Sequence, residues 1–414
     1  MKTDDLREVI RTYFNENVKE IEQTLIRLVR DMVKERTINV ISEKLSDFPF
    51  LTFRGEEYRV ANIVKQELEK HNIPYDEFTK MQGRPNIISK LGENSNGKRL
   101  LVPAHMDIVP AGDGWDHNPF DVVFKDGRLY GRGTNDNKGP LASLIVTAEV
   151  LRKLEIDKRL NGQLLLAALS DEEAIDPDGI DYGIGYLLEE KLITPTYAII
   201  PDIGGDMKEI DIAEKGRLIL KITAKGRQAH GSTPEKGLNA IYMMKKLLDK
   251  IEIMELSYEP HPFLGGPTVN LGEIHGGVSP NVVPGSCYIY LDIRTVPGMK
   301  SETILKTLRG YFDAVENGHF EIDVISESIP FSLDPDNELV ELIQKNTATF
   351  MNFKPNPIGM GGGTYAKDLI QHDVLTVGWG PGGDTAHIAN EYIELQQLFD
   401  FSLLICLIAI DLLQ

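Results

Sequence analysis

In the first half of the chain, short apolar runs alternate with longer segments in which apolar residues recur at helical spacing. Short apolar runs are typical of buried strands, and apolar residues at helical spacing are typical of helices. The predicted strands cover 86–92, 99–105, 162–170 and 196–202, and the predicted helices cover 139–156 and 183–192. A parallel pair of strands needs a long crossover connection, so this alternation predicts an α/β fold with a mainly parallel sheet.

From about Glu214 the pattern changes to strands in which apolar and polar residues alternate, as in a sheet with one exposed face. The predicted order is strand 216–226, helix 238–251, strands 268–277 and 286–296, helix 301–315 and strand 319–326. This βαββαβ order is that of a ferredoxin-like α+β unit. Around Leu333 the first pattern resumes, with a helix at 337–351 and a strand at 374–380. We therefore predict a discontinuous domain, 1–213 with 329–414, and an inserted domain, 214–328.

Both ends of the chain show helical patterns. Apolar residues between Leu6 and Phe14 fall on one helical face, and an apolar signal core is absent from this N-terminal pattern. Segment 401–413 is nearly all apolar, but it is shorter than the ~20 residues that span a bilayer. We expect a buried helix there and a cytoplasmic protein.

Length, charge and cysteine content narrow the classes of function. A chain of 414 residues is too long for one ordinary core, which agrees with two domains. The net charge of −19 argues against nucleic acid and anionic membranes as partners. The two cysteines form no CxxC motif, which argues against a disulfide framework and a thiolate zinc site. Any bound metal would be held by histidine and carboxylate side chains.

Acidic and histidine side chains follow the predicted strands of the first domain. The strand 99–105 ends in His105, and Asp107 lies two residues further on, where side chains share a strand face. Open α/β sheets bind ligands at the carboxyl edge of their strands. Alone, this pair is more often a histidine satisfied by a neighbouring carboxylate than a metal ligand. The other strand ends and nearby loops add Asp136, Asp171, Glu172, Glu173, Asp202 and His387.

Converging buried carboxylates are costly without positive charge, so this set predicts bound cations. Each acid taken singly would be an ordinary solvated loop residue. Two divalent cations carry four positive charges, which Asp136, Glu173, Asp202 and one hydroxide would balance. Such cations lower the pKa of a bound water to ~7 and so supply a nucleophile. Nitrogen and oxygen donors without thiolate suit zinc, with cobalt or manganese as alternatives.

The chain contains the motifs HMDIVP, GRGTNDNKG, SDEE, GRQAHGS and AHIANEYI, in this order. These five motifs and their order resemble those of the M20 co-catalytic zinc amidohydrolases. That family includes acetylornithine deacetylases, succinyl-diaminopimelate desuccinylases, aminoacylases and several dipeptidases. The resemblance covers nearly the whole chain. It implies a catalytic domain interrupted by a lid and dimerisation domain, and a homodimer that forms through the lid.

The resemblance also implies a role for each site residue. His105 and Asp202 resemble the ligands of one metal ion, Glu173 and His387 those of a second, and Asp136 the bridging carboxylate. Asp107 resembles the carboxylate that orients His105. Glu172 resembles the general base that takes a proton from water and passes it to the leaving amine.

The inserted domain contributes further candidates. His230, in GRQAHGS, resembles the residue that stabilises the oxyanion from across a dimer interface. Arg294 is a forked donor suited to a substrate carboxylate, although a surface ion pair is the alternative. Asn281 and Thr364 resemble substrate-binding elements, and Asn281 could equally be a turn residue.

Three hypotheses of function follow. The leading one is hydrolysis of the amide bond of N-acyl amino acids, and the second is a dipeptidase or carboxypeptidase acting on short peptides. Many deacylases have the sequence GGTDA where this chain has GGTYA, and this difference favours the peptidase branch. The sequence NKGP after Asp136 favours the same branch. The length of the chain and the size of the lid domain favour the deacylases. The loop after Glu173 is also longer than in many relatives. The third hypothesis is a catalytically silent binding protein, which should lack a ligand or the base; all are present.

Overall fold

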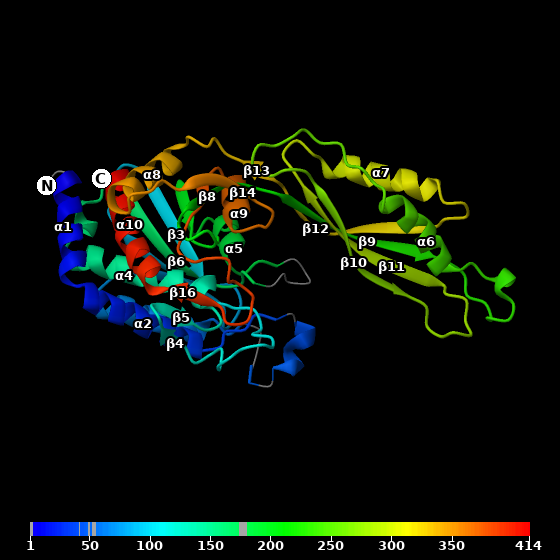
Figure 1. Ribbon diagram of the computed structural model, residues 1–414, viewed down its shortest axis with the longest axis horizontal. Helices are drawn as coiled ribbons and strands as arrows, with labels where there is room; N and C mark the ends of the chain where they lie inside the picture. The colour runs from blue at the N-terminus through cyan, green and yellow to red at the C-terminus, as the bar shows by residue number, and fades with distance from the viewer. Residues whose placement is uncertain (1–2, 41, 49, 52–54, 174–179) are drawn as a thin grey trace. The chain divides into compact units, whose positions relative to one another are not determined.

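The computed structural model describes residues 3–414 except 41, 49, 52–54 and 174–179. The chain divides into two compact units, each made of parts that are separate in the sequence. The first unit comprises Met1–Ile212, Asp334–Ile358 and Thr364–Gln414, and the second comprises Ala213–Leu333 and Gly359–Gly363. A large mixed sheet organises the first unit and a four-stranded sheet organises the second (Figure 1).

Four parallel strands form the centre of the large sheet. In spatial order they are β6 (Gln163–Leu169), β3 (Arg99–His105), β7 (Tyr197–Ile200) and β15 (Leu375–Gly378). Antiparallel strands flank them: β1 (Tyr75–Thr79) and β2 (Pro85–Leu91) beside β6, and β8 (Glu209–Glu214) beside β15. The short strands β13 (Phe331–Ser332) and β14 (Asn356–Met360) pair with β8. The predicted α/β class is confirmed.

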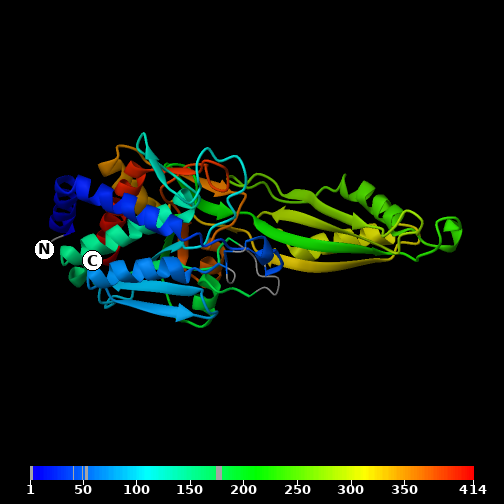
Figure 2. The same ribbon diagram turned by 90° about the horizontal axis from the view of Figure 1, so that it is seen from below.

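Helix α4 (Gly139–Lys153) is the central helix of the first unit, because nearly all of its residues are buried. It contacts β2, β3 and β6 on one side. Its helical neighbours are α2 (Val18–Lys34), α3 (Tyr58–Lys70) and α10 (Leu395–Leu413), and Figures 1 and 2 both show α2 beside α4. The expected N-terminal helix is α1 (Thr3–Glu16), which packs on α10 with Phe14 edge-on to Phe399.

Helix α10 begins earlier than expected. Its first residues include the polar Gln396, Gln397 and Asp400. Because these residues interrupt the apolar run, the sequence pattern did not indicate that the helix begins at Leu395. With 19 residues it is long and apolar enough to cross a membrane, so the expectation that it is too short was wrong. However, 72% of its most apolar window is buried inside the structure, as in the core helix of a globular domain.

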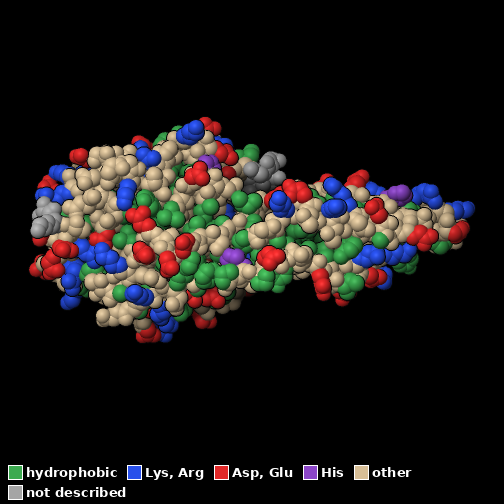
Figure 3. Space-filling view, turned by 90° about the horizontal axis from the view of Figure 1, so that it is seen from above, with side chains coloured by type: hydrophobic (Ala, Val, Ile, Leu, Met, Phe, Trp, Pro, Cys, Tyr) green, Lys and Arg blue, Asp and Glu red, His purple; other side chains and the backbone are tan. Residues whose placement is uncertain are grey.

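The remaining described elements of the first unit are short or peripheral. Its other α-helices are α5 (Ile184–Glu189), α8 (Glu338–Phe350) and α9 (Ala366–Gln371), and a three-stranded sheet is formed by β16 (Tyr392–Glu394), β5 (Arg128–Tyr130) and β4 (Val123–Lys125). Short helical turns cover Ser42–Asp47, Thr134–Lys138 and Asp157–Arg159. Figure 3 shows acidic and basic side chains interspersed over one face of the molecule, so the negative net charge forms no single large patch there.

The second unit has the predicted order of elements. They are β9 (Gly216–Lys225), α6 (Ala240–Ile251), β10 (Thr268–Gly276), β11 (Ser286–Thr295), α7 (Ser301–Asp313) and β12 (Phe320–Ser328). The antiparallel sheet has the spatial order β10-β11-β9-β12, the ferredoxin-like arrangement. Every second side chain of β11 is buried, and these pack with residues of α6 and α7. Strand β10 forms one edge and is exposed over almost its whole length.

Candidate metal centre and active site

Three neighbouring parallel strands end at one edge of the large sheet, and each end carries a candidate side chain. Strand β3 ends at His105, β6 is followed by Asp171-Glu172-Glu173, and β7 is followed by Pro201 and Asp202. Parallel strands present their carboxyl ends at the same edge, so the apolar strands bring these polar groups together.

Two further side chains reach this edge from loops. Asp136 lies in the turn Thr134–Lys138 directly before α4, and His387 lies in the loop before β16. The His387 side chain is 53% exposed, whereas that of His105 is fully buried. Solvent therefore reaches the cluster at His387.

The side chains form two groups of potential metal ligands that share Asp136. One group is His105, Asp136 and Asp202, the other is Asp136, Glu173 and His387, and within each group the ligand atoms lie within 4.8 Å of one another. Asp136 Oδ1 is 2.8 Å from Nε2 of His105, and Asp136 Oδ2 is 3.0 Å from Nε2 of His387. Asp136 thus has the position that a bridging carboxylate requires.

This donor set fits two divalent cations. Two ligand atoms that each lie ~2.1 Å from a tetrahedral zinc ion are about 3.4 Å apart. His105 Nε2 lies 2.8 Å from Asp136 and 3.9 Å from Asp202, and His387 Nε2 lies 3.0 Å from Glu173. Small movements would bring these atoms to the spacing of a metal site.

The electrostatics of the cluster also call for positive charge. Burial, together with the charge of Asp136, raises the pKa of Asp202 to about 7 and raises that of Glu173. Burial and the charge of Asp202 raise the pKa of Glu172 well above its usual range. Hydrogen bonds that His387 donates to the carboxylates of Asp136 and Glu173 raise the pKa of its imidazole to about 10. Carboxylates in such surroundings remain ionised at neutral pH only beside cations.

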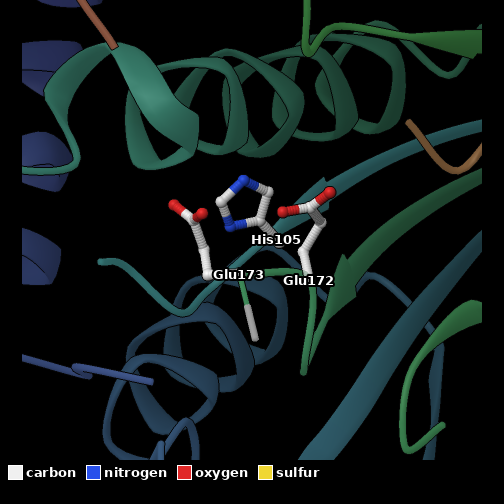
Figure 4. A group of neighbouring side chains, drawn as sticks. All are labelled: His105, Glu172 and Glu173. Atoms are coloured by element: carbon white, nitrogen blue, oxygen red, sulfur yellow. The ribbon is translucent and has the colours of Figure 1, made fainter. Parts of the chain in front are cut away.

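Glu172 and Glu173 take different places around His105. Figure 4 shows their carboxylates on opposite sides of the His105 imidazole. Glu173 also contacts His387 and belongs to a group with Asp136, whereas Glu172 shares a group only with His105 and Glu173. Glu172 therefore lies beside the pair of potential metal sites, and Glu173 forms part of one of them.

Asp107 contacts His105 and the segment after β6. Nδ1 of His105 lies 3.0 Å from the backbone oxygen of Asp107 and 3.5 Å from its Oδ1. Asp107 Oδ2 accepts hydrogen bonds of 3.0 Å from the backbone N–H groups of Glu172 and Glu173. Strand β3 ends at His105, so the expected shared strand face does not extend to Asp107. The backbone carbonyl orients the imidazole with Nε2 toward the cluster.

A buried polar network continues from Asp107. Asn39 Nδ2 donates to Asp107 Oδ2 at 2.7 Å and to Asp171 Oδ1 at 3.1 Å. Arg84 Nη1 lies 2.8 Å from Asp171 Oδ1, and its Nη2 lies 2.6 Å from Glu57 Oε1. The side chains of Arg84 and Glu57 are fully buried. One guanidinium therefore compensates two buried carboxylates.

The backbone of the segment after β6 is held by side chains from other parts of the chain. The side chain of Asn86 accepts the backbone N–H of Ser170, and that of Glu57 accepts the N–H of Asp171. Asp107 accepts the N–H groups of both Glu172 and Glu173. Four consecutive backbone donors are thus satisfied by three side chains. The positions of Glu172 and Glu173 therefore depend on residues distant in sequence.

Glu391 has the same function for the segment that carries Asp136. Its Oε1 accepts the N–H groups of Asn135 at 2.8 Å and Asp136 at 3.1 Å, and its Oε2 accepts that of Gly133 at 3.0 Å. Arg132 Nη1 lies 2.6 Å from Oε2. The carboxylate of Glu391 and its guanidinium partner are both buried.

The sequence patterns did not point to these supporting residues. Glu391 lies inside the motif AHIANEYI, four residues after His387, which is a signal that could have identified it. Asn137, beside Asp136 in GTNDNKG, donates to Asp202 Oδ1 at 3.1 Å and could have been found in the same way. Asn39, Glu57 and Arg84 lie in no such motif.

His230 belongs to the second unit, on an exposed loop. Its Nδ1 accepts a hydrogen bond of 3.1 Å from the backbone N–H of Ser232. An imidazole that accepts at Nδ1 carries its hydrogen on Nε2, so Nε2 is a donor. Asn281 lies beside this loop, because its backbone oxygen accepts the N–H of Gly231 at 2.8 Å.

Arg294 forms the ion pair that was the alternative to a role in substrate binding. Its Nε and Nη2 lie 2.8 Å and 2.9 Å from the two carboxylate oxygens of Asp292 on the same strand. The Nη1 group is outside this pair, 3.5 Å from the oxygen of Gly361. The carboxylate of Asp292 therefore holds the guanidinium in one orientation.

Thr364 lies in the first unit at the start of α9, where its Oγ1 accepts the N–H of Ala366 at 3.2 Å. This contact is that of a residue that begins a helix. The expected long loop after Glu173 includes residues 174–179, which lie outside the described residues.

Comparison with known proteins places this chain in a family. Residues 101–409 match the peptidase family M20/M25/M40. The chain is 30% identical to an uncharacterised metallohydrolase of Methanocaldococcus jannaschii, over 83% of this chain and 86% of the relative. It is 31% identical to an acetylornithine deacetylase of Pectobacterium carotovorum, over 75% and 78% of the two chains.

A solved structure, that of an aminopeptidase from Bacillus cereus, has a similar fold. The TM-score is 0.72 at 21% identity, over 95% of this chain and 99% of that one. The chain therefore belongs to the peptidase family M20/M25/M40, and it is a metallohydrolase of that family.

The two adjacent glutamates should respond differently to the same substitution. We expect two divalent ions per chain by elemental analysis, and loss of activity on treatment with a chelator. Glu173→Gln should lower the metal content, because Glu173 belongs to a ligand group with Asp136. Glu172→Gln, its matched control, should retain both ions while kcat falls by ~10²–10⁴, the scale of general acid–base catalysis. Equal metal loss in both variants would contradict these assignments.

Removing Arg84 should destabilise the first unit. In Arg84→Met, Glu57 and Asp171 remain buried without a counter-charge, and breaking a buried pair costs about 3–5 kcal/mol. The matched control is Arg128→Met, because Arg128 pairs with Glu394 on the surface, where such pairs contribute about 0–1 kcal/mol. Thermal unfolding followed by circular dichroism should show a much lower midpoint for Arg84→Met alone. Equal midpoints would show that the buried pair contributes no more than the exposed one.

Proposed function

We propose that the protein is a dinuclear zinc amidohydrolase that removes the acyl group from N-acyl amino acids. The observation that carries the proposal is the position of Asp136 between two histidines, with Glu172 beside both ligand groups. The likeness to an acetylornithine deacetylase over most of both chains supports the deacylase branch. Two zinc ions held there would supply Lewis acidity and lower the pKa of a water molecule to ~7.

The residues of the chain have separate tasks in this reaction. Glu172 accepts the proton of the attacking water and passes it to the leaving amine, because its lone pairs are not committed to a ligand group with Asp136. His230 donates a hydrogen bond from its Nε2–H to the substrate carbonyl oxygen as negative charge develops there. Arg294, oriented by Asp292, pairs with the substrate carboxylate through Nη1.

The second candidate function is a peptidase acting on short unblocked peptides. The segment GGTYA, around Thr364, favours this branch, as does NKGP after Asp136. Both functions use the same metal ligands and the same base. The silent binding protein is not supported, because the donor set and Glu172 are complete and the chain belongs to a family of hydrolases.

We further propose a homodimer in which two second units pair. The edge strand β10 exposes its backbone groups together with Leu271 and Ile274, which are 42% and 52% exposed. An exposed apolar edge strand is a ready template for pairing with another chain. In this arrangement His230 serves the partner's reaction centre, as the family resemblance implies.

A substrate panel tests the proposed reaction. Wild type should hydrolyse N-acetylornithine, N-succinyl-diaminopimelate or another N-acyl amino acid faster than unblocked dipeptides. Arg294→Ala should raise KM for substrates with a free carboxylate, Arg294→Lys should not restore it, and amidated substrates should be little affected. Arg309→Ala, on the exposed face of α7, is the matched control. Faster hydrolysis of dipeptides would favour the peptidase, and equal losses on both substrate forms would leave Arg294 a structural residue.

Mixed dimers test whether His230 acts in the neighbouring subunit. His230→Ala and Glu172→Gln should each be nearly inactive as homodimers, since one oxyanion donor contributes about 10²–10³ in kcat. In a heterodimer of the two variants, isolated with two tags, one site would be complete if His230 acts in trans. Activity should then return to about half that of wild type. A metal-replete heterodimer without activity would show that His230 serves its own chain.

A further inference from the structure

Tyr365 is a buried tyrosine of the first unit, directly before α9. Its side chain is 6% exposed, and its hydroxyl oxygen is buried without a hydrogen-bond partner among the described residues. The hydroxyl groups of Tyr75 and Tyr197, by contrast, donate to Glu69 and Glu338. A buried hydroxyl without a partner lowers stability, so its retention calls for an explanation.

The surroundings of this hydroxyl are those of the active site. Helix α9 packs against β7 and β15, and Asp202 follows β7. Burial and the negative charges of Glu172, Asp107 and Asp202 raise the pKa of the Tyr365 hydroxyl well above its usual range. The hydroxyl therefore keeps its proton, and beside carboxylates it can act only as a hydrogen-bond donor.

Glu172 is the carboxylate that lacks such a donor. Its backbone N–H is bound by Asp107, but its carboxylate accepts no hydrogen bond from the part of the chain that the structure describes. Glu173 differs, because its carboxylate contacts His387 at 3.0 Å. Asp202 accepts a hydrogen bond from Asn137. The buried hydroxyl of Tyr365 and the partly buried carboxylate of Glu172 are thus a donor and an acceptor that both lack a hydrogen-bond partner among the described residues.

We propose that the Tyr365 hydroxyl donates a hydrogen bond to the Glu172 carboxylate during turnover, which makes Tyr365 a positioning residue for the general base. The inference rests on the proposed function, in which Glu172 transfers a proton from water to the leaving amine. Such a carboxylate must reorient between two partners, and a neutral donor can hold it in one orientation without adding charge to the site. The hydroxyl of Tyr365 and the carboxylate of Glu172 lack a hydrogen bond in this structure because, in our proposal, they meet only when the carboxylate has turned during turnover.

The direct test is Tyr365→Phe, which removes only the hydroxyl. We expect kcat to fall on the order of ten- to a hundredfold, the effect of losing a hydrogen bond to a charged group, while KM stays within about twofold. Metal content should be unchanged and the melting temperature equal or higher, because the lost hydroxyl had no partner. The matched control is Tyr197→Phe at the opposite end of β7, whose hydroxyl bonds Glu338 near the surface, and its kcat should equal that of wild type.

The outcomes separate this role from others. An unchanged kcat, a rise of KM alone, or a lower melting temperature with a parallel loss of kcat would each overturn the proposal. The assay uses the substrate that wild type turns over fastest. A wild-type control in the same measurement therefore separates failure of this inference from failure of the proposed function.

A double-mutant cycle tests whether Tyr365 acts through Glu172. If it does, Tyr365→Phe should cause no further loss in a Glu172→Gln background, because the residue it positions is already disabled. The residual rates of Glu172→Gln and of the double variant should then agree within experimental error. A further loss of the same size as in wild type would show that the hydroxyl acts independently of Glu172, and the proposal would be wrong.

Discussion

The first unit must keep many carboxylates ionised inside an α/β domain, and most of its polar architecture meets that requirement. Where the acids converge at the strand ends, bound cations would supply the compensating charge. Behind them, Arg84 compensates Glu57 and Asp171, and Arg132 compensates Glu391. The supporting carboxylates in turn accept backbone N–H groups of the segments that carry the ligands. Asn39, Glu57 and Arg84 precede the region 101–409 that matches the family, so segments outside it also support the site.

The segment after β6 combines a hydrogen-bonded backbone with one carboxylate, that of Glu172, that lacks a hydrogen-bond partner among the described residues. Its four N–H groups are all accepted by side chains, whereas the carboxylate of Glu172 has no hydrogen-bond partner among the described residues. The general base that we propose Glu172 to be would need both properties, because it would transfer a proton between two partners. The hydrogen-bonded backbone sets the distance of Glu172 from the ligand groups. The carboxylate, which has no hydrogen bond to hold it, can turn between the water and the amine.

The sequence predicted the elements that carry local signals. Strands β2, β3, β6 and β7 follow from apolar runs, and the βαββαβ order follows from alternation, because both depend on short-range periodicity. The structure also brings the five proposed ligands together, since each lies at a strand end or inside a motif. The network of Asn39, Arg84 and Glu57 could not be predicted, because its partners are more than a hundred residues apart in several cases and depend on the folded sheet.

The division of the first unit has a consequence for the order in which the protein is made. Strand β15 pairs with β7, although the whole sequence of the second unit lies between these two strands. Helix α10, which packs in the core of the first unit, also follows the second unit in the sequence. The second unit is almost complete once residue 333 has been synthesised, while the first still lacks a central strand and its most apolar helix. Domains fold as units during synthesis, so the inserted unit should fold first. Until β15 and α10 have been synthesised, the apolar strands β3, β6 and β7 would lack part of their packing partners. We therefore expect the incomplete first unit to be the intermediate most prone to aggregation and most dependent on chaperones.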